Sequence, residues 1–241
     1  TWNDSTYTQS GTYSSNIGSD NNYSMSFDGT NDYVALADID LDGDFTIQSD
    51  IKIGTSQISA IYGKSDETYT VNGGPKGYML MVFNDKIRFG YRYTNNAIWN
   101  WVESNISLSY GQWHNVAVTR STNTIKLYID NTVVGTGSLS PDIIVNGPAY
   151  IGRFVNGHHG PKYHFNGNID NLSVWETALT DLEMQNNMNC LPTGSESTLE
   201  GYWNFNTGYG NTIDDQCCTE YNSTNDGTKS SEDVRWNIDS K

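Results

Sequence analysis

Phe45-Thr46-Ile47-Gln48-Ser49-Asp50-Ile51-Lys52-Ile53 alternates apolar and polar side chains, with apolar groups at the odd positions except Ser49. Successive side chains of a strand point to opposite faces, so this stretch predicts a strand with one buried and one wet face. The same period of two returns in residues 86–93 and 125–129, and the second run leads into the turn pair Asp130-Asn131. The pattern predicts β-hairpins.

Further strands are predicted at residues 78–83, 114–120, 150–153 and 169–175. The composition agrees, because 23 Gly, 16 Tyr and 7 Trp with only 17% charged residues are typical of short strands joined by polar turns. The sequence therefore predicts an all-β fold, an antiparallel sandwich of two sheets in a jelly-roll arrangement.

One short helix is predicted near residues 180–189. Thr180 can cap its start, Glu183 completes a T-x-x-E capping box, and Leu179 can pack onto Met184 one turn inside. A proline soon after the helix prevents its continuation. This helix is the only one that the sequence predicts.

The remaining segments suggest a single domain. Residues 1–21 are almost all polar and are interpreted as a linker or one peripheral strand. Residues 22–241 are expected to form the domain, with residues 199–236 supplying its last strands because they are too short to build a core of their own.

The charge balance restricts the partners. There are 13 Lys and Arg against 28 Asp and Glu, a formal net charge of −15. Nucleic acids and anionic membrane surfaces would be repelled, whereas neutral glycans, cations and basic protein patches remain open. No apolar run is long enough to insert in a membrane, and the first residues lack the form of a signal peptide. We expect a mature or excised segment.

Six segments in order, and a tail, point to a known family. The sequence resembles the laminin G-like, concanavalin A-like jelly-roll domains of bacterial surface or secreted proteins in residues 23–34, 45–47, 111–117, 126–130, 165–171 and 178–180 and in the tail 199–212. Phe165-Asn166-Gly167-Asn168-Ile169-Asp170-Asn171 is one such segment. The resemblance implies two antiparallel sheets, one of them concave, a structural Ca²⁺ at an edge of the sandwich, and a secreted or cell-surface location, bacterial in origin.

The resemblance also suggests where calcium would bind. Calcium prefers six to eight oxygen ligands, and the loop Asp28-Gly29-Thr30-Asn31-Asp32 offers carboxylate and carbonyl oxygens on a turn. The family places Asp170 close to this loop, so the expected ligands are Asp28, Asp32 and Asp170, with Thr30 and Asn31. The alternative is that Asp28 and Asp32 only cap turns. A second acidic stretch at residues 38–44 is interpreted as a solvated loop.

A sugar site needs exposed aromatic rings flanked by polar groups. Trp99 and Trp101 would point to one face of a strand and form a stacking platform, unless both are core residues. The ligand-binding residues expected around it come from three places: Trp99, Trp101 and Glu103; Arg88 and Arg92; and the loop with Arg153, His158, His159 and Tyr163. That loop could also be a surface loop without a ligand. Trp113, Trp175 and Trp203 are expected in the core.

Three cysteines lie in the last quarter of the chain, and none forms a C-x-x-C pair. A disulfide from Cys190 to Cys217 or Cys218 is expected, and three unpaired thiols are the alternative.

The sequence lacks the motifs of the common hydrolases. No E-x-D-x-E run of the kind that retaining glycosidases of this sandwich class present is found, and no G-x-S-x-G, H-E-x-x-H or P-loop occurs. We therefore expect a non-catalytic, extracellular carbohydrate-binding module that recognises a polysaccharide or cell-surface glycan and is stabilised by calcium. The alternative is a protein-binding or structural adhesion module, in which the partner is a cell-surface protein.

Overall fold

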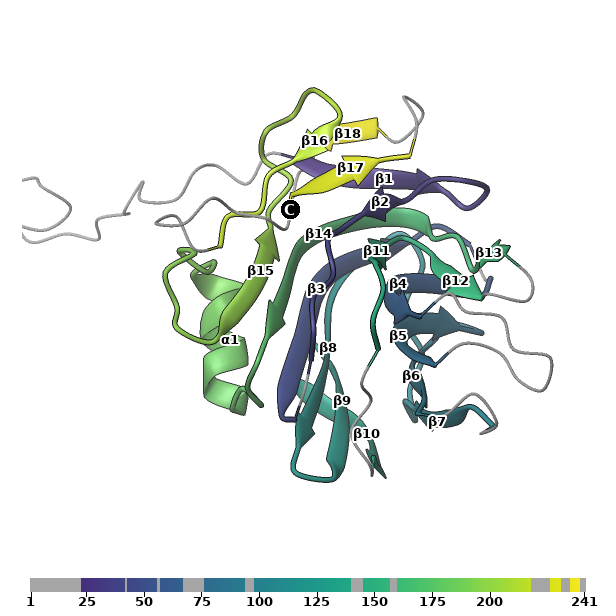
Figure 1. Ribbon diagram of the computed structural model, residues 1–241, viewed down its shortest axis with the longest axis vertical. Helices are drawn as coiled ribbons and strands as arrows, with labels where there is room; N and C mark the ends of the chain where they lie inside the picture. The colour runs from purple at the N-terminus through teal and green to yellow at the C-terminus, as the bar shows by residue number, and fades with distance from the viewer. Residues whose placement is uncertain are drawn as a thin grey trace, which may run out of the picture.

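A computed structural model describes residues 23–41, 43–55, 57–66, 76–93, 98–139, 145–156, 160–217, 226–230 and 235–238. The expected linker at residues 1–21 lies outside them. Two antiparallel sheets are stacked face to face, with one helix on the outer side of the first sheet and β4 to β7 on the far side (Figure 1). The predicted all-β sandwich with one short helix is confirmed.

The first sheet has the order β10-β9-β8-β3-β14-β1-β18, with β15 also paired to β14. Its strands are β1 (Tyr23–Asp28), β3 (Phe45–Ile53), β8 (Trp113–Ser121), β9 (Thr124–Ile129), β10 (Thr132–Ser138), β14 (Asn166–Trp175), β15 (Leu199–Trp203) and β18 (Arg235–Ile238). Strand β3, with its alternation of apolar and polar residues, lies in the middle of this sheet between β8 and β14.

The second sheet has the order β16-β17-β2-β11-β4-β5-β6-β7. Its strands are β2 (Val34–Ala35), β4 (Ser59–Ser65), β5 (Gly77–Phe83), β6 (Lys86–Arg92), β7 (Asn100–Glu103), β11 (Ala149–Ile151), β16 (Thr212–Ile213) and β17 (Gly227–Lys229). A separate hairpin consists of β12 (Phe154–Asn156) and β13 (Gly160–Lys162). The strands after residue 199 thus join the two sheets of the same sandwich.

The main core lies between the sheets. Alternation decides which side chains enter it: Phe45, Ile47, Ile51 and Ile53 of β3 point inward and are buried, while the polar residues between them point outward. Opposite them, Ile87 and the other inward residues of β6 close the core. The chemistry on the two outer faces therefore comes from the positions between the core residues.

Helix α1 (Asp181–Asn189) covers part of the outer face of the first sheet. The capping box is present, because Thr180 N donates to Glu183 Oε2 at 2.7 Å and Glu183 N donates to Thr180 Oγ1 at 3.3 Å. Leu179 and Met184 share a second apolar cluster with residues of β14 and β15. In the described part of the chain, no helix is long and apolar enough to cross a membrane.

Candidate functional site

An aromatic surface covers the outer face of β6 and β7, on the side of the sandwich away from α1. The antiparallel register sets Gly90 opposite Trp101 and Arg88 opposite Glu103. The indoles of Trp99 and Trp101 stack with ring centroids 5.4 Å apart and an interplanar angle of 24°. We call this surface, made of Phe83, Arg88, Trp99 and Trp101, the tryptophan face.

Trp101 lies flat over β6 because its neighbour there has no side chain. A Cβ atom on Gly90 would lie 2.2 Å from Cζ3 of the Trp101 indole, so any larger residue would displace the ring. The ring remains 42% exposed, which leaves an aromatic surface open to a ligand. The predicted placement of both indoles on one face is confirmed, and Trp101 is not a core residue.

Charged groups border this ring. Arg88 Nε donates to Glu103 Oε2 at 2.9 Å, and Lys86 Nζ lies 3.5 Å from Glu103 Oε1. Partial burial raises the pKa of Glu103, but the hydrogen bond and charge of Arg88 and the charge of Lys86 outweigh it and hold this pKa below its ordinary value. The Arg88 guanidinium also lies over the Phe83 ring at 3.8 Å and the Trp101 ring at 5.2 Å. These contacts fix the guanidinium beside the platform, with Nε and one terminal nitrogen both donating to Glu103 Oε2.

An apolar cluster supports the rings from below. The buried side chains of Ala60, Met79, Met81 and Phe154 form it, and Phe83, Trp99 and Tyr163 pack against them. Phe154 meets Trp99 edge to face with ring centroids 5.4 Å apart. The β12–β13 hairpin, from the predicted ligand loop, therefore adjoins the tryptophan face through Phe154.

Other predicted ligand residues have different positions. Arg92 lies on β6 opposite Gly77, on the same face as Arg88 but further along the strand. The Arg153 guanidinium is held between two rings, 3.3 Å from the centroid of Tyr33 and 4.0 Å from that of Tyr150, so it is a packed residue. His158 and His159 lie outside the described residues.

The predicted calcium loop is a set of capped turns. Asp28 Oδ1 accepts from Thr30 N at 2.7 Å, and Asp32 Oδ2 accepts from Asp28 N at 2.8 Å. The backbone carbonyl of Asn31 accepts from Ser230 Oγ at 3.3 Å. These contacts are those of the turn-capping alternative. They leave carbonyl and carboxylate oxygens at one edge of the sandwich, the atom type that calcium prefers.

Asp170 does not join this loop, which corrects the predicted ligand set. Asp28 pairs with Asn166 at the start of β14, whereas Asp170 lies four residues further and pairs with Asp50 of β3. At a rise of about 3.3 Å per residue the separation along the strand is about 13 Å, too far for shared coordination. Among the described residues, no three His, Cys, Asp or Glu side chains converge as a metal site. One ion cannot bind Asp28, Asp32 and Asp170 together.

The acidic stretch at residues 38–44 does more than face solvent. The ammonium group of Lys64, whose side chain is 1% exposed, forms ion pairs with Asp38 and Asp40 and donates to the carbonyl of Ile39 at 2.7 Å. Two half-exposed carboxylates thus compensate one buried charge. The interpretation of this stretch as a solvated loop was incomplete for that reason.

The expected disulfide between Cys190 and Cys217 is not formed. Cys190 follows α1 and carries an exposed, free thiol. Cys217 is buried, and its Sγ donates to the carbonyl of Leu199 at 2.9 Å. Cys218 lies outside the described residues. The predicted pairing of Cys190 with Cys217 is therefore wrong, and the predicted pairing with Cys218 stays a prediction.

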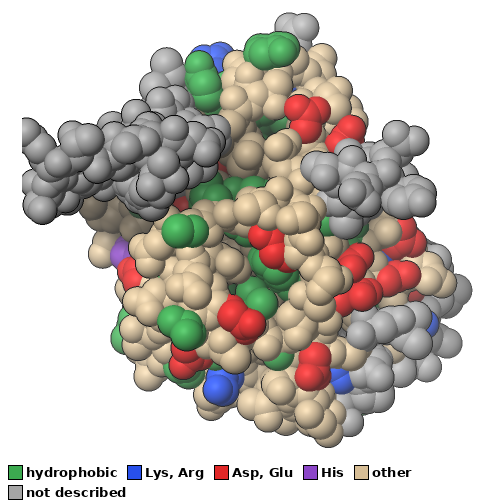
Figure 2. All heavy atoms as spheres, turned by 90° about the vertical axis from the view of Figure 1, so that its left-hand side faces the viewer, with side chains coloured by type: hydrophobic (Ala, Val, Ile, Leu, Met, Phe, Trp, Pro, Cys, Tyr) green, Lys and Arg blue, Asp and Glu red, His purple; other side chains and the backbone are tan. Residues whose placement is uncertain are grey.

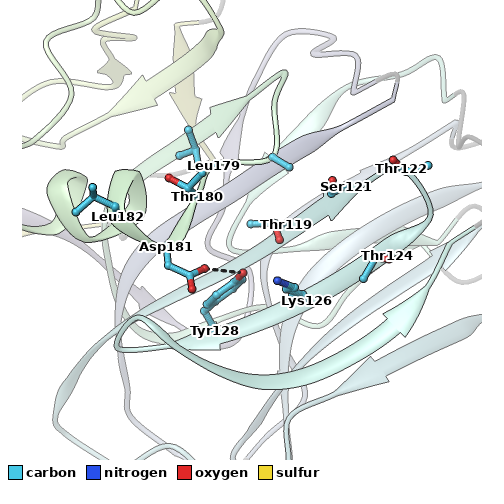
Figure 3. A pocket seen from close by; sticks show the side chains of 11 residues that line it. Thr119, Ser121, Thr122, Thr124, Lys126, Tyr128, Leu179, Thr180, Asp181 and Leu182 are labelled. Carbon is cyan, nitrogen blue, oxygen red and sulfur yellow. Dashed lines mark hydrogen bonds between the residues drawn. The ribbon is translucent and has the colours of Figure 1, made fainter.

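A groove of about 730 Å³ lies on the opposite side of the sandwich, between the β8–β9 hairpin and the start of α1 (Figure 3). Threonine and serine hydroxyls of both strands line it together with Lys126, and the Tyr128 hydroxyl donates to Asp181 Oδ1 at 3.2 Å. The Tyr128 side chain is 3% exposed, so its ring cannot stack on a ligand. This groove lacks an exposed aromatic platform.

The fold and the family agree. A family model described as concanavalin A-like lectin/glucanases superfamily, of the laminin G type, matches residues 28–185. The chain belongs to this superfamily. No curated protein matches the chain.

Solved structures of the superfamily fold resemble the chain at low identity. A proposed carbohydrate-binding protein from Bacteroides ovatus has a TM-score of 0.67 at 17% identity, over 90% of this chain and 60% of that chain. This chain thus spans about 60% of the length of that protein. A pentraxin from Limulus polyphemus has a TM-score of 0.54 at 18% identity, over 71% and 83%. The CBM40 of a Ruminococcus gnavus sialidase, bound to α2,3-sialyllactose, has 0.52 at 16%, over 59% and 80%.

Sequence reasoning missed three features of the site and misplaced one tryptophan. Phe83, Lys86 and Gly90 were not predicted as site residues, although the period of two in β5 and β6 already turns all three outward. Trp175 and Trp203 are core residues, as expected. Trp113 is not, because it starts β8 on the outer face and remains half-buried under Lys52, whose Nζ lies 4.9 Å from the ring centroid.

Proposed function

We propose that this chain is a non-catalytic carbohydrate-binding module of an extracellular protein, and that it holds a sugar on the tryptophan face. The observation that carries the proposal is the stacked pair of Trp99 and Trp101, with the second ring 42% exposed beside Arg88 and Glu103. The C–H face of a pyranose can pack on such an indole. The carbohydrate-binding descriptions of two structural neighbours support the same class of ligand.

The polar groups would orient the sugar. Arg88 is a donor with a fixed position, and Glu103 is an acceptor whose lowered pKa keeps it ionised near neutral pH. Lys86 adds a second donor. A ring stacked on Trp101 would therefore find both donors and an acceptor at its rim, which is the combination that sugar hydroxyls need.

Catalysis has one candidate pair that the sequence did not reveal. Burial raises the pKa of Glu200 in β15, and the charge and hydrogen bond of Glu176, which directly follows β14, raise it further, so the two carboxyl groups lie close together. Neither residue lines the 730 Å³ groove or lies on the tryptophan face. The proposed binding function uses neither carboxylate.

Calcium at the loop of Asp28 and Asp32 stays a prediction, without Asp170 as a ligand. In that role the ion would tie two turns together at the edge of the sandwich, and the sugar would be held by the tryptophan face in any case. The extracellular location also stays part of the proposal, supported by the family to which the chain belongs.

The test is a glycan array with the wild-type chain, the variant Trp101→Ala and the control Lys126→Ala, which changes a residue of the opposite face. We expect the wild type and the control to bind the same glycans and Trp101→Ala to lose at least tenfold in affinity, about 1.4 kcal/mol. Equal binding by all three chains would refute the tryptophan face as the site. Binding to no glycan, together with capture of a protein through the exposed Ile98 beside Trp99, would favour the protein-binding alternative.

A further inference from the structure

A second hollow lies on the face that carries α1, between the start of β8 and the end of the helix. Its volume is about 430 Å³, within the range of small-molecule sites. The lining side chains are Asp50, Gln112, Trp113, His114, Asn115, Asp130 and Met188, which we call the acidic hollow. Because β3 and β8 belong to the first sheet, this hollow and the tryptophan face lie on opposite sides of the sandwich.

A relay of hydrogen bonds fixes the Asp50 carboxylate. Asn115 Nδ2 donates to Asp50 Oδ1 at 2.8 Å, and Asn171 Nδ2 donates to Asp50 Oδ2 at 2.9 Å. Behind them, Gln48 Nε2 donates to Asn115 Oδ1 at 2.9 Å and the Tyr202 hydroxyl donates to Asn171 Oδ1 at 3.2 Å. Both series of hydrogen bonds end at the Asp50 carboxylate, and together they hold it in a single orientation.

The second carboxylate, Asp130, is fixed in the same way. Its Oδ1 accepts from Asn115 N at 2.9 Å, and its Oδ2 is 2.8 Å from His114 Nδ1. Ser109 N donates to His114 Nε2 at 3.2 Å, so Nδ1 carries the proton and donates to Asp130. Both ring nitrogens are in use, which makes His114 a positioning residue.

The chemistry of the hollow selects a ligand with many donors. A carboxylate oxygen that accepts one hydrogen bond can accept another, and an ionised carboxylate donates none. Trp113 and Met188 supply apolar surface beside these acceptors. Hydroxyl groups on a sugar ring meet both requirements at once, and the wider surface on this side carries many acidic and few basic side chains (Figure 2). The two carboxylates, Asp50 and Asp130, outnumber the one ammonium group at the hollow, that of Lys52 over the Trp113 ring, so acidic sugars would be repelled.

We propose that the acidic hollow is a second carbohydrate-binding site, specific for neutral and amino sugars. It rests on the proposed function for the class of ligand, but on a separate set of residues for the site. The module would then bind sugar on both outer faces. Two sites that point in opposite directions cannot serve one short oligosaccharide, and they suit the joining of neighbouring polysaccharide chains.

The experiment is a titration followed by amide and indole NMR signals of the whole chain, with glucose, N-acetylglucosamine, glucosamine and glucuronic acid as probes. We expect the neutral and amino sugars to shift the signals of Trp113, Asn115 and Asp130, and glucuronic acid to leave them in place. Trp113→Ala and Asp130→Asn should each weaken binding at the hollow at least tenfold. Asp130→Asn is the gentler change, because asparagine tolerates the positive φ of 48° at this position.

Controls separate this proposal from the first. Lys126→Ala, on the same outer face but outside the hollow, should leave both sets of shifts unchanged, and Trp101→Ala should remove only those of the tryptophan face. Sugar-dependent shifts at Trp101 without any at Trp113 would overturn the second site and leave the proposed function intact. Shifts at Trp113 that Asp130→Asn leaves unchanged, or that glucuronic acid causes equally, would also overturn it.

Discussion

The substitution Gly90→Ala tests the tryptophan face through a residue that a sugar would not touch. The new Cβ would lie 2.2 Å from Cζ3 and 2.6 Å from Cε3 of the Trp101 indole. Ordinary van der Waals contact begins near 3.4 Å, so the ring must move outward by at least about 1.2 Å. The ring cannot move toward β6, and the stack with Trp99 has to open.

The size of the effect follows from this displacement. Opening the stack of Trp99 and Trp101 forfeits about 0.5–1.5 kcal/mol of aromatic pairing. Overpacking usually costs about 1–3 kcal/mol, and the lower end applies here because the half-exposed indole can swing toward solvent. A platform displaced by about 1 Å no longer matches the donors of Arg88, so we expect sugar affinity to fall about tenfold, or 1.4 kcal/mol.

A double-mutant cycle provides the assay. Affinity for the best array ligand is measured by calorimetry for the wild type, Gly90→Ala, Trp101→Ala and the double variant, with thermal melting of each as a check on folding. If Gly90 acts by leaving room for the Trp101 indole, Gly90→Ala has no further effect on sugar affinity once Trp101 is replaced by alanine. Additive losses in the cycle would show that the two residues act separately, and would refute the role of Gly90 in positioning the Trp101 indole.

Three further outcomes are expected. Lys64→Ala should lower the free energy of unfolding, measured by urea denaturation, by about 3 kcal/mol, because it empties the buried volume of the stem and removes both ion pairs. Lys64→Met, which keeps the stem, should lose less, and equal stability of the wild type and both variants would contradict this. Glu200→Gln should raise the melting temperature at pH 7. The pKa of Glu200 is raised in the folded state, so the fold loses stability as the pH rises through that pKa, and glutamine, which does not ionise, avoids this loss. That gain should vanish below about pH 4, where both states are protonated, and a gain of the same size at both pH values would point to another cause. If the Asp28 loop binds calcium, a chelator should lower the melting temperature of the wild type and not that of Asp28→Asn, and an unchanged wild-type melting curve would remove the metal.

The period of two made the tryptophan face predictable. In any strand, Trp99 and Trp101 must share a face, and the same rule turns Phe83 and Arg88 outward. The sequence does not state that β6 and β7 are neighbours, and this pairing is what combines the predicted sites at Arg88 and Trp101 into one. Local alternation gives the face of each side chain, but the partner strand depends on long-range contacts.

The same limit explains the error at Asp170. The family resemblance puts β14 beside the Asp28 loop, and the two do pair, but through Asn166. The register shifts between Asp170 and Ser173, where Asn171 has a φ of 47°. A bulge of this kind moves side chains along and across the strand, and no local pattern in the sequence announces it. The register from Asn166 to Asp170 is regular and precedes this bulge, so Asp170 lies beside Asp50 because it is four residues further along β14 than Asn166.

The position of Trp113 shows why a shared fold leaves the ligand open. The inward residues of β3, β6 and β8 build a core that any member of the superfamily requires, whereas the outward positions between them carry no such constraint. Trp101 over Gly90 and Trp113 beside Asp130 both occupy outward positions, on opposite faces. Structures that match this chain at 16–18% identity share its sandwich. Binding specificity in this chain must therefore be tested at its own outward residues, and substitutions there should change sugar affinity with little effect on the melting temperature.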